Sequence, residues 1–331
     1  MSKYNCDLIS EEESDKWDAF VKSHADGTFF HLWGWLKFCE RKSGYKLYPI
    51  ILEKGGSIQG VYPVFLKSLF GFTVIASPPP KVSTPYLGPL LINSSDNVYK
   101  REKNEFSMIE ILHQYVQDKL KPNYQKIDTA TGFKDPRPFI WNNYRAKPRF
   151  TYVVSLTNIE SVFNNLDGRV RTSIRKAEKS KDIFYSHDAN EKISDIISFI
   201  SQRYDEQKLK FPLSSSDVEK IQNSCLGKYI HVNAIWEGER LVTGNILIKF
   251  HNKIQHWLGG VKPYSETNGV NELLHWEGMK KFSLEGYSSY ELIGANTKHL
   301  CDHKSKYGPE LSQYFQLEQA SGLGKLLYTF R

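Results

Sequence analysis

The stretch "GYSSYELIGANTKHLCDHKSKYGPEL", residues 286–311, runs from an alternating segment into a Gly-Ala-Asn corner. Reactive and cationic side chains gather directly after this corner: His299, Cys301, Asp302, His303, Lys304 and Lys306. Three kinds of site use these residue types. They are a metal site, a nucleophile site, and a cationic cradle for a reactive carbonyl.

The metal and nucleophile interpretations find little support in the neighbouring residues. In a strand, His299, Cys301 and His303 would share one face, and zinc could use that trio. Three lysines crowd the same segment, however, and the rest of the chain offers no second ligand pair at metal-finger spacing. A Cys-His nucleophile also needs a third, orienting group, and only Asp302 is adjacent to Cys301. We therefore expect no metal and no covalent intermediate.

The elements around this stretch predict an α/β unit. We expect strands at 151–156 and 287–294, helices at 169–181, 190–208 and 269–286, and three strands within 229–260 that turn at Glu237-Gly238. The first half has a similar order. We expect helices at 11–24 (capped by Ser14), directly after 28–31, and at 104–121, and strands at 45–54, 58–68 and 124–130, with a hairpin turn at Gly55-Gly56-Ser57.

The order helix-helix-strand-strand-helix-strand thus occurs twice, which predicts two similar α/β units with mixed sheets. Residues 77–89 hold five of the 14 prolines and cannot form a regular helix. The turn-rich segment 134–150 is the expected boundary between a first domain, residues 1–150, and a second, residues 151–311.

Composition indicates an ordinary globular protein. The chain has 331 residues and a net charge of +7, which is consistent with a phosphate-bearing partner but also common among proteins without one. The four cysteines form no C-x-x-C, which favours a reducing compartment. The polar N-terminus has no signal-peptide core and no apolar run could span a bilayer, so we expect a cytoplasmic protein.

Residues 169–181, "RVRTSIRKAEKSK", form a basic helix with an apolar stripe at Val170, Ile174 and Ala177. Arg171 and Arg175 lie one turn apart on an adjacent face, where two guanidinium groups suit a phosphate. A solvated basic face beside a core stripe explains the same pattern, so both interpretations stay open.

The strand "KIQHWLGGV", residues 253–261, places Gln255 and Trp257 on one face and His256 on the other. His256 is either functional or structural. Gly260 permits close approach of a ligand to the backbone, or simply ends the strand. Asn271 lies in the first turn of the following helix, whose free amides and dipole suit an anion, or it caps that helix.

Five motifs together resemble the Fem-type (FemAB) aminoacyltransferases, and they occur in the family's order along nearly the whole chain. They are "GTFFHLWGWLKF" (27–38), "SPPPKVSTPYLGP" (77–89), the basic helix, residues 257–287, and "IGANTKHLCDHKSKYG" (293–308). The resemblance implies two tandem GNAT-like acyltransferase domains with a cleft between them. It also implies that residues 312–331 return to complete the first domain.

The resemblance further implies transfer of an amino acid from aminoacyl-tRNA to an amine of a peptide or diphosphate-linked cell-envelope precursor, as in peptidoglycan bridge formation, with no cofactor. "HKSKYG", residues 303–308, resembles the family's Phe-Lys-x-x-Phe-Gly motif, with Tyr307 in the second aromatic place. Lys304 would then stabilise the oxyanion that forms when an amine attacks an ester. Asn296 flanks it, and Lys37 and Arg203 match residues that hold the acceptor's diphosphate.

Acetyl-CoA is the rival donor, because GNAT folds often use it. Its diphosphate usually binds the motif Gln/Arg-x-x-Gly-x-Gly/Ala, and the chain matches this motif only at Gln319–Gly324. Only seven residues follow the match, too few for the helix and strands that should come after it. We interpret that match as a coincidence. A CoA-dependent N-acyltransferase and a non-catalytic RNA-binding protein remain the alternatives.

Overall fold

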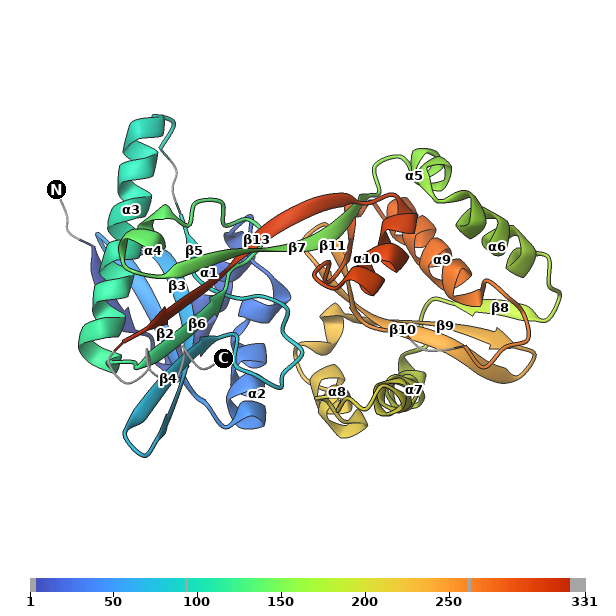
Figure 1. Cartoon of the computed structure of the whole chain (residues 1–331), viewed down its shortest axis with the longest axis horizontal. Helices are drawn as coiled ribbons and strands as arrows, with labels where there is room; N and C mark the ends of the chain where they lie inside the picture. The colour runs from blue at the N-terminus through green and yellow to red at the C-terminus, as the bar shows by residue number, and fades with distance from the viewer. Residues whose placement is uncertain (1–3, 93–94, 261–262, 322–331) are drawn as a thin grey trace. The chain divides into compact units, whose positions relative to one another are not determined.

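The computed structural model describes residues 4–92, 95–260 and 263–321 (Figure 1). These residues form two compact units. Unit 1 contains the chain up to Arg149 and again from Gln313 onward, and unit 2 is Phe150–Ser312. That these units are the functional domains expected at 1–150 and 151–311 stays a prediction.

Unit 1 is a mixed sheet covered on both faces by helices. Its strands are β1 (Asn5–Leu8), β2 (Lys46–Lys54), β3 (Ser57–Leu69), β4 (Phe72–Ser77), β5 (Leu90–Leu91), β6 (Tyr124–Asp128) and β13 (Glu310–Ala320), and its helices are α1 (Ser14–Ser23), α2 (Trp33–Ser43), α3 (Val98–Tyr115) and α4 (Arg137–Trp141). The strand order is β1-β2-β3-β4-β6-β13, with β5 beside β3. Only the β4–β6 pair among these is parallel, and α3 lies between its strands in the sequence.

Local sequence explains most of these elements. Gly55 and Gly56 both have positive φ and close the predicted hairpin between β2 and β3. The expected cap at Ser14 is wrong, because a short 3-10 turn, Glu11–Glu13, precedes α1 and Ser14 is already helical. Strand β4 was not predicted from its sequence. The expected return of the C-terminal segment is visible up to residue 321, where β13 pairs antiparallel with β6.

Unit 2 repeats this arrangement. Its strands are β7 (Arg145–Ser155), β8 (Ile183–Ser186), β9 (Ile230–Glu237), β10 (Arg240–Phe250), β11 (Lys253–Leu258) and β12 (Ser289–Leu292), and its helices are α5 (Ile159–Asn165), α6 (Gly168–Glu178), α7 (Ile193–Glu206), α8 (Ser215–Gln222), α9 (Val270–Leu284) and α10 (Lys298–Lys304). The order is β7-β12-β11-β10-β9-β8. Again one pair is parallel, β11 with β12, and α9 connects its two strands. The predicted mixed α/β architecture is therefore confirmed in both units.

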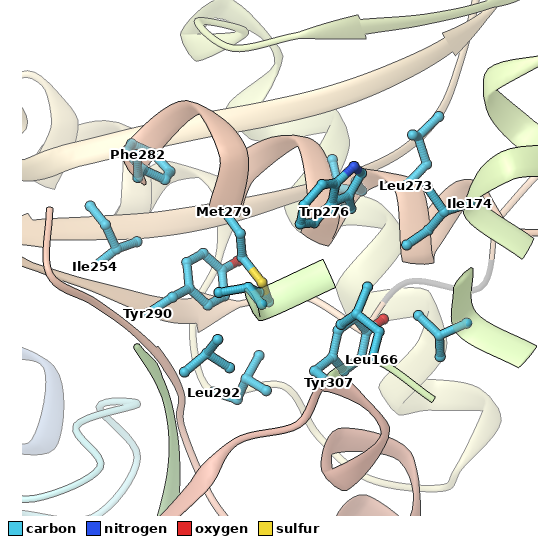
Figure 2. Close-up of a cluster of buried hydrophobic side chains, with 14 of the residues drawn as sticks. Leu166, Ile174, Ile254, Leu273, Trp276, Met279, Phe282, Tyr290, Leu292 and Tyr307 are labelled. Atoms are coloured by element: carbon cyan, nitrogen blue, oxygen red, sulfur yellow. The ribbon is translucent and has the colours of Figure 1, made fainter. Parts of the chain in front are cut away.

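The core of unit 2 lies between α9 and the sheet. Figure 2 shows Met279 of α9 beside Tyr290 of β12, and Leu273 of the same helix beside Ile174 of α6. The buried residues of α9 spread around much of the helix, because the sheet covers one side of it and α5 and α6 pack against another. α7 packs on the opposite face of the sheet, where Ile196 closely approaches the strand glycine Gly244. The strands are therefore covered on both sides, and polar side chains inside them need specific partners.

Candidate active site

The two parallel strands of unit 2, β11 and β12, separate near their carboxyl ends. Their pairing covers Lys253–Gln255 and Ser289–Glu291, and β11 then continues to Leu258 beside β10. Because α9 connects them as a crossover, both strands end at the same edge of the sheet. Open α/β sheets bind ligands at such carboxyl edges.

A cluster of rings lines this edge on the face toward α9. His256 lies 4.7 Å from His275 between ring centroids, and His275 lies 4.9 Å from Tyr307. Tyr290 contacts both histidines, and its hydroxyl is 3.4 Å from His275 Nδ1. His275 was missed in the sequence, since a histidine inside an apolar helix carries no distinctive pattern.

Burial keeps these rings uncharged at neutral pH. It lowers the pKa of His275 to about 3 and the pKa of His256 well below its usual range. It also raises the pKa of the Tyr290 and Tyr307 hydroxyls. Neither His256 Nε2 nor the Tyr307 hydroxyl has a hydrogen-bond partner within the described residues. The cluster is therefore a fixed, neutral and polar lining, and catalysis by His256 stays a prediction.

Lys304 supplies the cation at this edge. Its side chain is partly buried at the end of α10, and Nζ donates to the carbonyl oxygens of Ile293 and, at 3.1 Å, Gly294. Burial lowers the pKa of Lys304 to about 8, although the nearby Glu291 carboxylate favours the charged form. An ammonium has three N–H donors, so one remains after these two bonds.

Gly294 keeps the space beside this ammonium open. Its φ is +86°, and a Cβ built there would meet Lys304 Nζ at 3.9 Å and no other described atom within 4 Å apart from its chain neighbours. A substrate oxygen could therefore reach the ammonium from this side. The strand-to-helix loop thus positions the charge and leaves access to it.

Glu291 was also missed in the sequence. It is a buried acid on the face of β12 opposite Tyr290, and it accepts hydrogen bonds from Thr151 Oγ1 at 2.8 Å and Gln255 Nε2 at 2.9 Å. The sequence did carry a signal for it, namely an acidic residue between the hydrophobic residues Tyr290 and Leu292 in a short predicted strand. Both neighbours donate to the buried acid, and Glu291 in turn favours the charged form of Lys304.

Asn296 holds the loop that carries the Lys304 carbonyl partners. Its side chain accepts from the Phe150 N–H and donates to the Phe150 carbonyl, both at 2.9 Å. Ala295 N–H donates to the same carbonyl. These bonds tie the loop to β7. The structure therefore shows a positioning role for Asn296, and its contact with substrate stays a prediction.

Three other predicted site residues surround the end of β11. Trp257 is buried on the face away from His256. Gly260 has φ +85° and is open, so its backbone is accessible. Asn271 accepts a 2.7 Å bond from Thr243 Oγ1 in the first turn of α9, and Gly269 caps that helix without a side-chain bond. Their roles in binding stay predictions.

The two arginines of α6 both lie toward α5. Arg171 donates through Nη1 to the carbonyls of Asn164 and Leu166, at 2.7 and 2.6 Å. Arg175 lies over the Phe163 ring, 5.4 Å from its centroid. Arg171 thus closes the end of α5, and the phosphate role of the pair stays a prediction.

Lys37 and Arg203 lie in different units. Lys37, in α2 of unit 1, pairs with Glu40 at 2.6 Å and Glu11 at 3.6 Å. Arg203, in α7 of unit 2, pairs with Glu206 at 2.8 Å on the surface. A shared diphosphate for these two cations stays a prediction.

The strand that a zinc site at His299, Cys301 and His303 would require does not form. The segment is helix α10, and residues two apart in a helix diverge by about 200°. The trio therefore does not share a face. Of the CoA-like match, Gln319 lies in β13 and bonds Gln125 and the Asn142 carbonyl, while Gly322 and Gly324 lie outside the described residues.

Residues 165–305 match the family model of an acetyltransferase (GNAT) domain. This segment holds most of unit 2, including Lys304 and the histidine pair. The prediction of an acyltransferase is confirmed at this level. No curated protein matches the chain by sequence.

Solved structures share the fold over nearly the whole chain at low identity. FemX matches with a TM-score of 0.72 and 14% identity, covering 98% of this chain and 99% of that one. The C-terminal domain of a putative lysylphosphatidylglycerol synthetase from Agrobacterium fabrum matches with a TM-score of 0.59 and 12% identity, over 96% and 95%. A tandem GNAT protein from the clavulanic acid biosynthesis pathway matches with a TM-score of 0.55 and 10% identity, over 97% and 99%. The predicted Fem-type fold of tandem GNAT-like units is thereby confirmed.

Among the described residues, none of the helices combines the length and apolar character needed to cross a lipid bilayer.

Proposed function

We propose that this acyltransferase forms an amide bond by moving an amino acid from aminoacyl-tRNA to an amine of a peptide or cell-envelope precursor. The observation that carries the proposal is the Lys304 ammonium, held by two carbonyls and reachable beside Gly294. The likeness in fold to FemX supports it.

Lys304 is suited to an ester donor. When an amine nitrogen attacks the ester carbonyl carbon, the carbonyl oxygen becomes an oxyanion. The remaining N–H of Lys304 would donate to that oxygen, and its positive charge acts in a partly desolvated setting where it is stronger than in water. The intermediate collapses as the ester C–O bond breaks, and the ribose oxygen takes a proton. No metal or covalent enzyme intermediate enters these steps.

The proposal also specifies the chemical identity of the acceptor and of the donor. Cations such as Lys37, Arg171, Arg175 and Arg203 are candidates for the diphosphate of the acceptor or the backbone of the tRNA. Acetyl-CoA is the second candidate donor, since the matched family model is that of an acetyltransferase. The same oxyanion chemistry would apply to its thioester.

The test compares donors and Lys304 variants. Purified protein would receive aminoacyl-tRNA, deacylated tRNA or acetyl-CoA at physiological salt, because a basic protein holds RNA non-specifically at low salt. We expect transfer from aminoacyl-tRNA, and a loss of roughly 10- to 100-fold in kcat for Lys304→Met, with partial recovery in Lys304→Arg. Lys298→Met, an exposed lysine of the same helix, is the matched control.

Each outcome has one meaning. Transfer from acetyl-CoA alone would make the protein a CoA-dependent N-acyltransferase. Binding of tRNA regardless of its aminoacyl group, with no transfer from either donor, would favour the RNA-binding alternative. Full activity of Lys304→Met would refute the role of the ammonium.

A further inference from the structure

Two asparagines lie inside unit 2 beneath α9. Asn233 of β9 and Asn245 of β10 are directly opposite in the sheet and are 0% and 1% exposed. None of their four amide nitrogen and oxygen atoms has a hydrogen-bond partner within the described residues. The next residues on this face, Ile235 and Leu247, belong to the apolar core. Folded proteins satisfy such buried amides with ordered water when protein atoms do not reach them.

Two glycines let α9 and the end of β11 approach these polar groups closely. A Cβ on Gly278, in the middle of α9, would lie 3.0 Å from Asn233 Nδ2 and 3.6 Å from the Tyr185 hydroxyl. A Cβ on Gly259 would lie 3.3 Å from Asn245 Cβ and 2.5 Å from His256 Nε2. Any other residue at either position would crowd these polar groups. With no Cβ at either position, no side chain of these residues interrupts the path of polar groups between α9 and the strands.

The outer end of this path reaches solvent. The Tyr185 hydroxyl and His187 Nδ1 are buried without partners within the described residues, and their rings lie 4.3 Å apart. His231, two residues before Asn233, shares its face of β9 and lies 3.3 Å from the Asp188 carboxylate. The Asp188 side chain is 76% exposed. Burial lowers the pKa of His231, and the nearby Asn233 amide partly offsets this effect. No hydrogen bond of normal geometry joins the two side chains.

The inner end reaches the candidate active site. His256 borders Asn245 across Gly259, and its ring lies 4.7 Å from His275. The charge of Lys304 contributes to lowering the pKa of both histidines, which shows that the rings are within its electrostatic reach. Polar groups thus continue from the neighbourhood of Lys304 to the surface at Asp188.

We propose that Asn233 and Asn245 hold a file of ordered water molecules that conducts the acceptor's proton from the active site to solvent at Asp188. This inference rests on the proposed function. An alkylamine acceptor is an ammonium at neutral pH and must lose one proton before its lone pair can attack. The reaction of an ammonium with an ester gives an amide, an alcohol and one proton. That proton passes to the first water, held between His256 Nε2 and Asn245, and leaves along the file. The two asparagines are positioning residues.

Gly278→Ala tests the path by narrowing it. Alanine is the better helix former, so α9 is kept while its methyl group crowds Asn233 and Tyr185. Wild type, Gly278→Ala and a control, Leu284→Ala, exposed in the same helix, would be assayed with the acyl donor that the wild type uses. Each would receive an alkylammonium acceptor and, separately, hydroxylamine, which is neutral at neutral pH and has no such proton to lose.

We expect Gly278→Ala to lower kcat roughly tenfold with the alkylammonium, with little change in KM, and to leave the rate with hydroxylamine unchanged. A distortion of the site would slow both acceptors equally. Equal slowing, or no slowing, would overturn the proton path and leave the proposed function standing. A wild type that acylates neither acceptor, and no peptide amine either, would overturn the proposed function and the path together.

Discussion

Lys304 should make the stability of the protein depend on pH in a defined window. Its pKa is about 8 in the folded protein, against 10.5 for a free lysine side chain. Between these values the unfolded chain binds the proton and the folded protein does not, so the free energy of unfolding rises with pH. Between pH 7 and pH 10 this single group should raise the free energy of unfolding by ~2.5 kcal/mol, at ~1.4 kcal/mol for each pKa unit of difference.

The assay compares urea unfolding of wild type and Lys304→Met at several values between pH 7 and pH 10. Other titrating groups are shared, so the difference between the two proteins isolates Lys304. The wild type should gain stability relative to Lys304→Met as the pH rises. Lys298→Met controls for the loss of an exposed lysine. A difference that stays constant across this range would refute the partial burial of the ammonium on which the proposed mechanism depends.

Three further changes test the scaffold around the site. Gly269→Ala should cost at least ~2 kcal/mol in urea unfolding, because φ is +96° and its Cβ would lie 2.4 Å from a carbonyl oxygen of α6. Gly286→Ala, at φ +87° and with no described atom beyond its chain neighbours within 4 Å of the new Cβ, measures the cost of the backbone conformation alone, so equal costs would contradict the clash. Asn296→Ala should cost about 1–2 kcal/mol in urea unfolding by removing its two bonds to the β7 backbone, and an unchanged unfolding free energy would contradict that role. Between pH 7 and pH 5 the free energy of unfolding should fall by ~2 kcal/mol less in His275→Leu than in the wild type. The reason is that His275 is neutral in the folded protein and takes up a proton on unfolding below about pH 6.5. Equal acid sensitivity of the two proteins would contradict its burial.

Periodicity and turn residues predicted the two α/β units because those signals are local. Val170, Ile174 and Ala177 recur at helical spacing, and all three are buried as expected. Gly55 and Gly56 fall where the hairpin needs positive φ. The spacing of the trio at 299–303 left its secondary structure open, because alternation over five residues does not distinguish a strand from a short helix.

The amino-acid sequence alone was sufficient to identify Lys304 as a candidate, the Fem-like order of motifs and the mixed α/β class. They could not show that Lys304 is held by two carbonyls, that Glu291 supports its charge, or that the rings of His275 and His256 lie side by side. They also could not show that Asn233 meets Asn245 inside the sheet. Each of these contacts joins residues that are distant in sequence, and burial, which decides their charge and their need for partners, exists only once the strands and α9 have packed together.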